Sequence, residues 1–307
     1  MPFSVVMHVC RRGGRRDVSY VTSKQRDLRL VYILHGAACV NSTLNSKQDG
    51  YSDGSFLTAG DSVLLVEGEA LQSDGYCGDI VDEFSLSAIE VAVASAHAPL
   101  AAPKCGNISG KPHPALGFAA VERLFASRSR QRQNASDASA PYGRHKGNVR
   151  GLADADTFRL PGQSNRVALV WDPHRDEDCK VGFSFGIEIL EPSHVTPRHM
   201  HSRGYEMFIL LSGSGTAECD GEKWHIRAGD TVVFTPGSLH GIDVDCSGRM
   251  YCLQMMLPDD DFAKYVRSGD DTGGTLEAED LCTLVSIACD LDSSPSHADT
   301  ERSARSM

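Results

Sequence analysis

The feature that most limits how this chain can fold is an internal repeat. Residues 59–71 (AGDSVLLVEGEAL) align without a gap on residues 228–240 (AGDTVVFTPGSLH), and both segments share an Ala-Gly-Asp start, an apolar run and a later glycine. Upstream of each, residues 30–38 (LVYILHGAA) resemble residues 207–215 (MFILLSGSG) if the first copy has a longer loop. Self-similarity of this kind predicts two copies of one structural unit.

The repeated unit has the pattern of β-structure. Short apolar or β-branched runs bounded by Gly, Pro, Asp or Ser are typical of strands separated by turns. In the second copy these runs are residues 167–170, 183–190, 207–211, 231–235 and 250–257. Helix is sparse in the pattern, and the best candidate begins at Asp259 and ends at Gly269.

One hairpin can be placed closely from the sequence. Asp220-Gly221 favours a two-residue type I′ turn. This turn makes Ala217 and Trp224 opposite neighbours on one face, and Glu218 and Lys223 opposite neighbours on the other. On this register Trp224 is expected to point to a core.

Composition and charge exclude some classes of function. The chain has 30 Lys and Arg against 41 Asp and Glu, a formal net charge of -11, which disfavours nucleic acid as a partner. It lacks the apolar run of about 18 residues that a membrane-spanning helix needs. Positive charges follow the short apolar N-terminal run, the reverse of a secretion signal, so a cytoplasmic location is expected. The 10 cysteines form no C-x-x-C pair and are expected to be reduced thiols.

The chain is expected to divide into four segments. The two repeats occupy residues 1–100 and 158–268. Residues 101–157 include a stretch rich in Ser, Arg, Gln and Asn with too little apolar surface to order it, and they are expected to form a flexible linker or insertion. Residues 269–307 are acidic and then Ser-rich, and are expected to form a disordered tail.

The second copy contains a group of metal-ligand residue types that the first copy lacks. Residues i and i+2 of a strand project from the same face, so His199 and His201 can offer two imidazoles to one point. Glu206 has the wrong parity for an unbroken strand, and Gly204 permits the bend that would bring it in. His240 follows a Pro-Gly turn and can close the site. Three imidazoles and one carboxylate suit Fe(II), Mn(II), Zn(II), Ni(II) or Cu(II), and suit calcium poorly.

The order and spacing of these residues resemble the two motifs of the cupin superfamily, G-x5-H-x-H-x3-4-E-x6-G and G-x5-P-x-G-x2-H-x3-N. The first motif lacks its leading glycine here, and the second has Pro and Gly adjacent and no final Asn. The matching positions are His199, His201, Glu206, Gly213, Gly229, Pro236, Gly237 and His240. The resemblance covers about residues 167–257.

This resemblance implies an all-β fold of two double-stranded β-helix (cupin jelly-roll) barrels, the first of them degenerate. It also implies a divalent metal held in the mouth of the second barrel by His199, His201, Glu206 and His240. Fe(II) or Mn(II) is the favoured ion, with Zn(II) or Ni(II) as alternatives.

The alignment of the two copies predicts that the first barrel binds no metal. Thr22 and Lys24 fall opposite the two histidines of the first motif, Arg29 falls opposite Glu206, and Leu71 falls opposite His240. Lys and Arg are cationic and Leu has no lone pair, so these residues are poor metal ligands. The first barrel is therefore expected to pack against the second and stabilise it.

The resemblance implies a metal-dependent enzyme, either a dioxygenase or a related lyase or isomerase, that acts on a small organic acid or phenolic compound. Tyr205, as a proton carrier, and Glu206 are the candidate catalytic residues. A non-catalytic binding, storage or sensor protein is the alternative. Besides its substrate, a second copy of the chain is an expected partner, because exposed sheet edges favour a homodimer. The expected pocket residues are Arg198, Tyr205, Met207, Phe208, Trp224, Tyr251, Gln254 and Met256.

Overall fold

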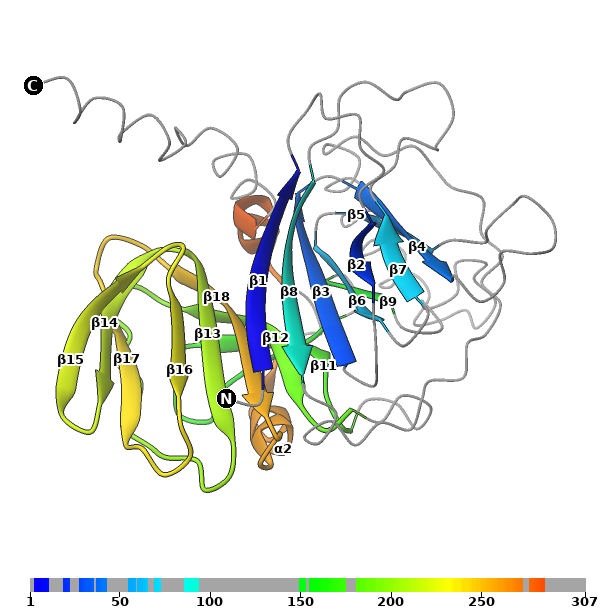
Figure 1. The fold of residues 1–307 in the computed structure, drawn as a ribbon. Helices are drawn as coiled ribbons and strands as arrows, with labels where there is room; N and C mark the ends of the chain where they lie inside the picture. The colour runs from blue at the N-terminus through cyan, green and yellow to red at the C-terminus, as the bar shows by residue number, and fades with distance from the viewer. Residues whose placement is uncertain are drawn as a thin grey trace, which may run out of the picture.

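The computed structural model contains two β-rich units, one in each half of the chain (Figure 1). It describes residues 3–10, 19–22, 28–35, 37–42, 55–58, 60–65, 69–72, 86–93, 149–152, 155–174, 181–272 and 276–284, and every structural statement below concerns these residues.

The C-terminal unit is built from two sheets. The larger sheet has the strand order β16-β13-β18-β12-β11-β10-β19, and the smaller has the order β15-β14-β17. Their strands are β10 (Asp156–Arg159), β11 (Arg166–Trp171), β12 (Ser184–Leu190), β13 (Tyr205–Ser212), β14 (Ser214–Cys219), β15 (Glu222–Arg227), β16 (Thr231–Phe234), β17 (His240–Val244), β18 (Met250–Leu257) and β19 (Asp270–Asp271).

The N-terminal unit also has two sheets, with the orders β1-β8-β3-β6-β9 and β2-β7-β4-β5. Its strands are β1 (Phe3–Cys10), β2 (Ser19–Thr22), β3 (Leu28–His35), β4 (Ala37–Ser42), β5 (Ser55–Thr58), β6 (Asp61–Leu65), β7 (Glu69–Gln72), β8 (Leu86–Val93) and β9 (Val149–Gly151).

The predicted repeat is present in strand order and in register. The run β1-β8-β3-β6 corresponds to the run β12-β18-β13-β16 of the larger C-terminal sheet. Arg29 pairs with Leu65 across β3 and β6, and Glu206 pairs with Phe234 across β13 and β16. Because Leu65 and Phe234 are also aligned in the sequence repeat, the two halves share one topology.

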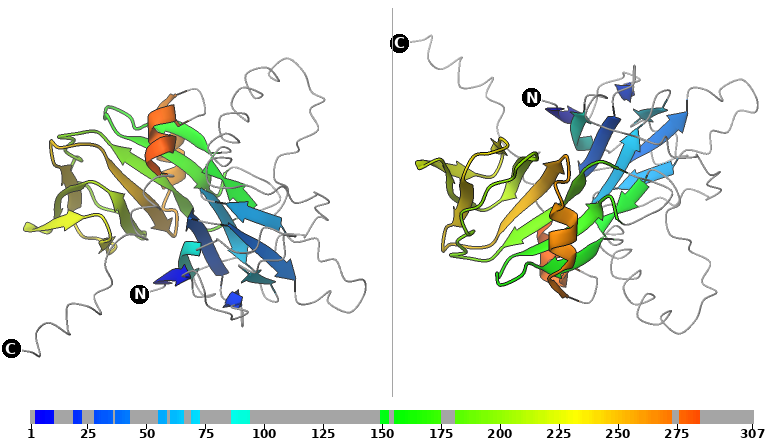
Figure 2. Two further views of the ribbon diagram at one scale, coloured as in Figure 1. Left: turned by 90° about the horizontal axis from the view of Figure 1, so that it is seen from above. Right: turned by 90° about the horizontal axis from the view of Figure 1, so that it is seen from below.

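The central strands of the large C-terminal sheet, β11, β12, β13 and β18, are buried on both faces, which explains why they are almost continuously apolar. Met207 and Ile209 of β13 share a cluster with residues of the N-terminal sheet such as Leu30. Their neighbours Phe208 and Leu210 point the other way and belong to the interior of the C-terminal barrel. Figure 2 shows the N-terminal strands stacked against the back of this sheet.

A tryptophan joins the two units. The indole Nε1–H of Trp171 donates a hydrogen bond of 2.8 Å to Ser62 Oγ, and this hydroxyl donates in turn to the carbonyl oxygen of Arg150 at 3.0 Å. The Arg150 guanidinium lies over the indole ring, 4.4 Å from its centroid. Trp171 is among the largest fully buried side chains, so the contact between the units satisfies its polar atom as well as its apolar surface.

The hairpin and the helix lie where the sequence predicts them. Ala217 pairs with Trp224 across the β14–β15 turn, and Asp220 and Gly221 have the positive φ angles, 50° and 88°, that a type I′ turn needs. Helix α2 spans Phe262–Arg267. The expectation that Trp224 points to a core is wrong: its side chain is 40% exposed, because β15 is the edge strand of the small sheet.

Part of the predicted tail belongs to the fold. Strand β19 pairs with β10, and a helix at residues 278–284 places Leu281 and Leu284 in the cluster between the two units. Asp280 is completely buried and forms a 2.8 Å ion pair with Arg166. The physical reason is that a few leucines and one buried ion pair anchor a segment whose overall composition is polar. The remainder of the tail, residues 273–275 and 285–307, lies outside the described residues.

The predicted linker also contributes to the fold at its end. Residues 149–151 form strand β9, which pairs with β6, and β10 begins at Asp156. Residues 101–148 lie outside the described residues.

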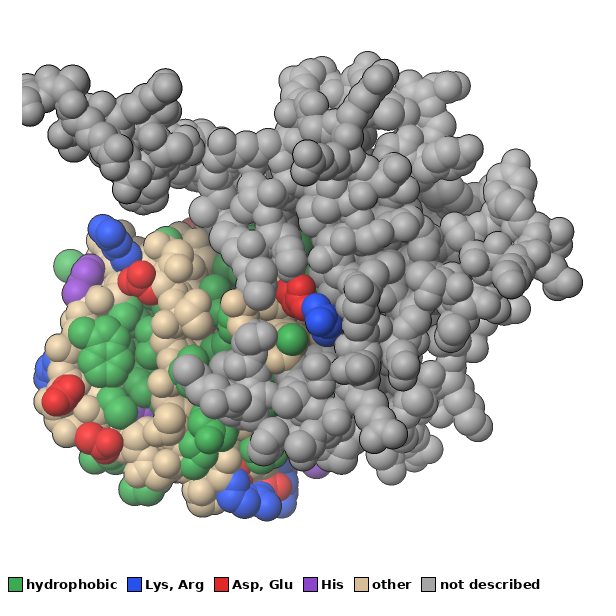
Figure 3. All heavy atoms as spheres, viewed as in Figure 1, with side chains coloured by type: hydrophobic (Ala, Val, Ile, Leu, Met, Phe, Trp, Pro, Cys, Tyr) green, Lys and Arg blue, Asp and Glu red, His purple; other side chains and the backbone are tan. Residues whose placement is uncertain are grey.

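The surface of the C-terminal unit mixes charges and apolar groups. On the face drawn in Figure 3, acidic and basic side chains are interspersed with hydrophobic ones over the described part of that unit. Among the described helices, none has both the length and the apolar character to cross a membrane. The expected homodimer stays a prediction.

We predict that Trp171→Ala lowers the free energy of unfolding by about 3–5 kcal/mol, because it leaves a cavity between the two units. Trp224→Ala, the matched control on the edge strand, should cost less than about 1 kcal/mol. Urea denaturation followed by circular dichroism measures both values. If Trp171→Ala lowered the free energy of unfolding as little as the control, the prediction that Trp171 stabilises the contact between the two units would be contradicted.

Candidate metal centre

The site lies at one end of the C-terminal barrel, where two loop segments meet strand β13. His199 and His240 form an isolated antiparallel bridge, with backbone hydrogen bonds of 3.1 and 2.9 Å in the two directions. The Gly237 N–H donates to the carbonyl oxygen of His201 at 2.8 Å. These bonds tie the loop of the first motif to the turn at Gly237 and the start of β17, so that His199, His201 and His240 face the same space.

Glu206 is the second residue of strand β13. It follows a bend at Ser202 and Arg203. At Gly204, between this bend and β13, a Cβ atom would lie 2.5 Å from Met256 Sδ, so that only glycine fits without a shift. Strand alternation then sends Glu206 into the barrel beside Phe208. The bend that the parity argument required is therefore present.

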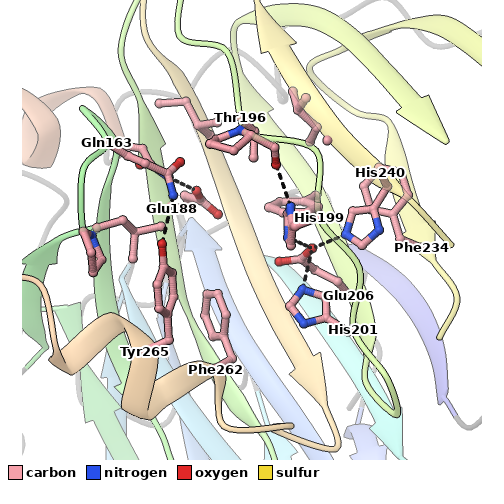
Figure 4. A pocket seen from close by; sticks show the side chains of 18 of the residues that line it. Gln163, Glu188, Thr196, His199, His201, Glu206, Phe234, His240, Phe262 and Tyr265 are labelled. Atoms are coloured by element: carbon pink, nitrogen blue, oxygen red, sulfur yellow. Dashed lines mark hydrogen bonds and ion pairs between the residues drawn. The ribbon is translucent and has the colours of Figure 1, made fainter. Parts of the chain in front are cut away.

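The three imidazoles converge on one carboxylate oxygen (Figure 4). Glu206 Oε2 lies 2.9 Å from His240 Nε2, 3.5 Å from His201 Nε2 and 3.7 Å from His199 Nε2. The candidate ligand atoms of these four residues all lie within 4.8 Å of one another. A group of this kind could hold one metal ion.

Backbone carbonyls fix the orientation of two of the rings. His199 Nδ1 lies 2.9 Å from the carbonyl oxygen of Pro197, and His240 Nδ1 lies 2.9 Å from that of Ser238. A carbonyl oxygen only accepts, so each Nδ1 carries a proton, and Nε2 is the ring nitrogen that faces the site. Phe234 stacks on His240, with ring centroids 4.2 Å apart, and restricts its rotation.

The charges of the site suit a cation. Burial by itself would raise the pKa of Glu206, but the hydrogen bond with His240 and the close approach of His201 outweigh it and lower this pKa to about 2. Burial lowers the pKa of His199. His201 Nε2 is buried and makes no hydrogen bond within the described part of the chain. A metal ion coordinated to this nitrogen would satisfy an atom that the protein leaves without a partner.

The four residues line a pocket of about 530 Å³. Its walls are mainly apolar, and its described lining includes no Lys or Arg. The carboxylates in the lining are Glu188, Glu206, Asp260 and Asp261. Asp260 is already paired with Arg203, at 2.9 Å.

The comparisons with known proteins identify the fold. The family model described as a cupin domain matches residues 186–253. The C-terminal unit therefore contains a cupin domain. No curated protein matches its sequence.

Solved structures similar to this cupin share its fold over both halves. An oxalate decarboxylase of Bacillus subtilis is 13% identical, with a TM-score of 0.50 over 84% of this chain and 69% of that one. An oxalate decarboxylase of Lactobacillus farciminis is 14% identical, with a TM-score of 0.51 over 84% and 77%. A putative glyoxylate-induced protein of Pseudomonas aeruginosa is 11% identical, with a TM-score of 0.50 over 83% and 74%.

The first cupin unit carries an arginine where the second carries its carboxylate. Strand pairing puts Arg29 at the position of Glu206, and Arg29 Nη1 forms an ion pair with Glu90. Glu90 stands at the position of Gln254, and Gln254 donates to Glu206 at 3.3 Å. The first unit therefore has the cationic guanidinium of Arg29 at the position where the second unit has the carboxylate of Glu206.

The first unit is described less fully at the positions that correspond to His199, His201 and His240. The backbone pairs Val21 with Leu71, as His199 pairs with His240, so Val21 takes the place that the sequence alignment gave to Thr22. Lys24 lies outside the described residues.

Several residues expected in the pocket lie elsewhere. Of that set, Phe208 lines the pocket. Met207 and Tyr251 point to the N-terminal unit because strand neighbours face opposite ways. Arg198 pairs with Asp243 and Glu218 at 2.9 and 2.8 Å.

Tyr205 is not among the pocket residues. It is the neighbour of Glu206 on β13, and adjacent strand residues leave the strand on opposite sides. Its role as a proton carrier stays a prediction that its position does not support.

Sequence reasoning missed the polar groups on the far wall of the pocket. Glu188 lies there on β12, and Asn165 Nδ2 donates to its Oε1 at 2.5 Å. Burial, with a contribution from the charge of Glu206, raises the pKa of Glu188 to about 8. A signal was present, since Glu188 is the one charged residue in the apolar run FSFGIEIL at residues 183–190.

We predict that Glu188→Gln changes how the stability of the metal-free protein depends on pH. The folded-state pKa of Glu188 lies above its ordinary value, so its stabilising contribution is complete below about pH 4.5 and is lost as the pH rises through about 8. Relative to the variant, the wild type should lose a few kcal/mol of unfolding free energy over this range. Urea denaturation at a series of pH values measures the difference, and parallel curves for the two proteins would contradict the prediction.

Proposed function

We propose that this cupin is a metal-dependent enzyme that acts on a small oxygen-containing organic molecule bound at the metal. The observation that supports this most strongly is the convergence of three imidazole nitrogens on Glu206 Oε2 inside a pocket of about 530 Å³. A barrel kept only for its shape needs neither the converging ligands nor the space beside them. The reaction we favour is that of a dioxygenase, with a lyase or isomerase as the related alternative.

The donor set favours Fe(II) or Mn(II) as the resident ion. His199, His201, Glu206 and His240 would hold it, and such an ion would supply Lewis-acid polarisation of a bound oxygen atom, or oxygen activation. Zn(II) and Ni(II) also accept imidazole and carboxylate ligands and are the alternatives.

The chain's own residues would orient the substrate and keep water away. Phe208, Phe234 and Phe262 form an apolar surface around the ligands. Within the barrel, Gln254 donates to Glu206 Oε1 at 3.3 Å and holds the carboxylate in place. A substrate would therefore meet the ion on the open side of the pocket, with its apolar body against the phenylalanines.

The charge of the pocket supports one substrate class over another. The structural neighbours include oxalate decarboxylases, and oxalate carries two carboxylates. The described lining of this pocket contains four carboxyl groups and no Lys or Arg, so a dianion would depend on the metal alone for compensation. We therefore favour a phenolic or other hydroxylated substrate over a dicarboxylate.

We predict that the purified protein binds close to one equivalent of Fe or Mn, and that His240→Ala and Glu206→Gln each lower the metal affinity by about 100-fold or more. His225→Ala is the matched control, because this histidine is exposed on β15. Plasma mass spectrometry before and after reconstitution measures the metal content.

Oxygen consumption by the metal-loaded protein with a panel of catechols then tests the reaction. Uptake of oxygen that His240→Ala abolishes is the expected result. Metal binding without any turnover would point to the non-catalytic alternative, and failure to bind any metal would refute the proposal.

A further inference from the structure

The wall of the pocket that faces the histidines carries a second set of polar groups. They come from three elements that are separate in the sequence: the turn at residues 160–165, strand β12 and helix α2. Figure 4 shows Gln163 and Glu188 together on this side, across the pocket from His201 and His240. Neither the metal ligands nor the apolar lining accounts for a polar wall at this place.

Asn165 has an amide oxygen without a partner. The side chain is fully buried, and its Nδ2 donates to Glu188, but its Oδ1 makes no hydrogen bond within the described part of the chain. Gln163 is similar, since its Nε2 donates to the Tyr265 hydroxyl at 3.1 Å while its Oε1 is buried without a partner. Buried acceptors of this kind are destabilising unless a donor reaches them. A ligand group that donates a hydrogen bond would satisfy them.

Glu188 adds a group that can donate as well as accept. It is almost fully buried, and its pKa of about 8 keeps it protonated at neutral pH. A protonated carboxyl offers one O–H donor together with acceptor oxygens. Asn165 and Glu188 side by side therefore present both kinds of partner, which is what a hydroxyl group requires.

Charge argues against an anion at this wall. A substrate carboxylate there would lie near Glu188 and Glu206, and the described lining has no cationic side chain to compensate it. Two buried carboxyl groups in contact can be accommodated only by sharing a proton, which disfavours the second negative charge.

We propose that Asn165 and Glu188 form a subsite for a hydroxyl group on an uncharged part of the substrate, separate from the oxygens that bind the metal. This inference rests on the proposed function, because it assumes a substrate that is held at the metal by its other end.

The test uses three probes that share one chelating ring and differ at a single terminal group. They are ethylcatechol, hydroxyethylcatechol and carboxymethylcatechol, which end in a methyl, a hydroxyl and a carboxylate. Titration calorimetry of the metal-loaded protein without oxygen gives their dissociation constants. Hydroxyethylcatechol should bind about fivefold to tenfold more tightly than ethylcatechol, and carboxymethylcatechol should bind most weakly.

Variants assign the preference to the subsite. Glu188→Leu and Asn165→Ala should each remove the preference for the hydroxyl while leaving the affinity for ethylcatechol within about twofold. Glu188→Gln, which keeps an uncharged donor and acceptor, should retain it. If Glu188→Leu does not fold, Asn165→Ala and Glu188→Gln still form a matched pair.

Equal affinities for the methyl and hydroxyl probes would overturn the subsite, as would a preference for the carboxylate or the failure of all three probes to bind the loaded protein. A hydroxyl preference that persists in both Glu188→Leu and Asn165→Ala would also overturn it. Metal analysis and oxygen consumption by the same samples separate these outcomes from a failure of the proposed function, because the latter predicts a protein that either cannot be loaded or shows no turnover once loaded.

Discussion

The structure depends on the central strands of the large C-terminal sheet, which are buried on both faces. Strands β12, β13 and β18 are buried along almost their entire length, because alternate side chains serve two different cores. One set packs against the N-terminal unit, and the other fills the barrel and surrounds the site. The hydrophobic contact between the units therefore holds the same strands that position Glu206 and Glu188. A shift of one residue in register would exchange the two faces and move both carboxyl groups out of the pocket.

The candidate metal site contains a charge whose burial is unfavourable by itself. Glu206 is a buried carboxylate, and a buried charge is destabilising unless it is paired. Three imidazoles and the amide of Gln254 surround it, and the approach of the imidazoles outweighs the effect of burial on its pKa. Glu188 lacks such partners apart from Asn165, so the same burial raises its pKa. Two carboxyl groups on one face of one sheet thus acquire opposite protonation states at neutral pH.

The first unit shows how a repeat can lose a site and keep its fold. Arg29 takes the position of Glu206 and pairs with Glu90 across β3 and β8. An ion pair between two side chains there replaces the charge balance that a carboxylate and a metal would provide.

The sequence by itself determined the repeat, the β-structure, the β14–β15 hairpin and the four candidate ligands, because these follow from local spacing and turn chemistry. It did not determine which side chains line the pocket. Met207 and Phe208 are both apolar, so their residue types do not show which of them faces the site. Phe208 shares the face of Glu206 by strand alternation, and Met207 packs in the cluster with the N-terminal unit. It also left Glu188 and Asn165 apart, because they meet only when β12 pairs with β11 and the turn before β11 closes over them. The anchoring of residues 276–284 likewise arose from long-range contacts, since Asp280 is stable in the interior only beside Arg166.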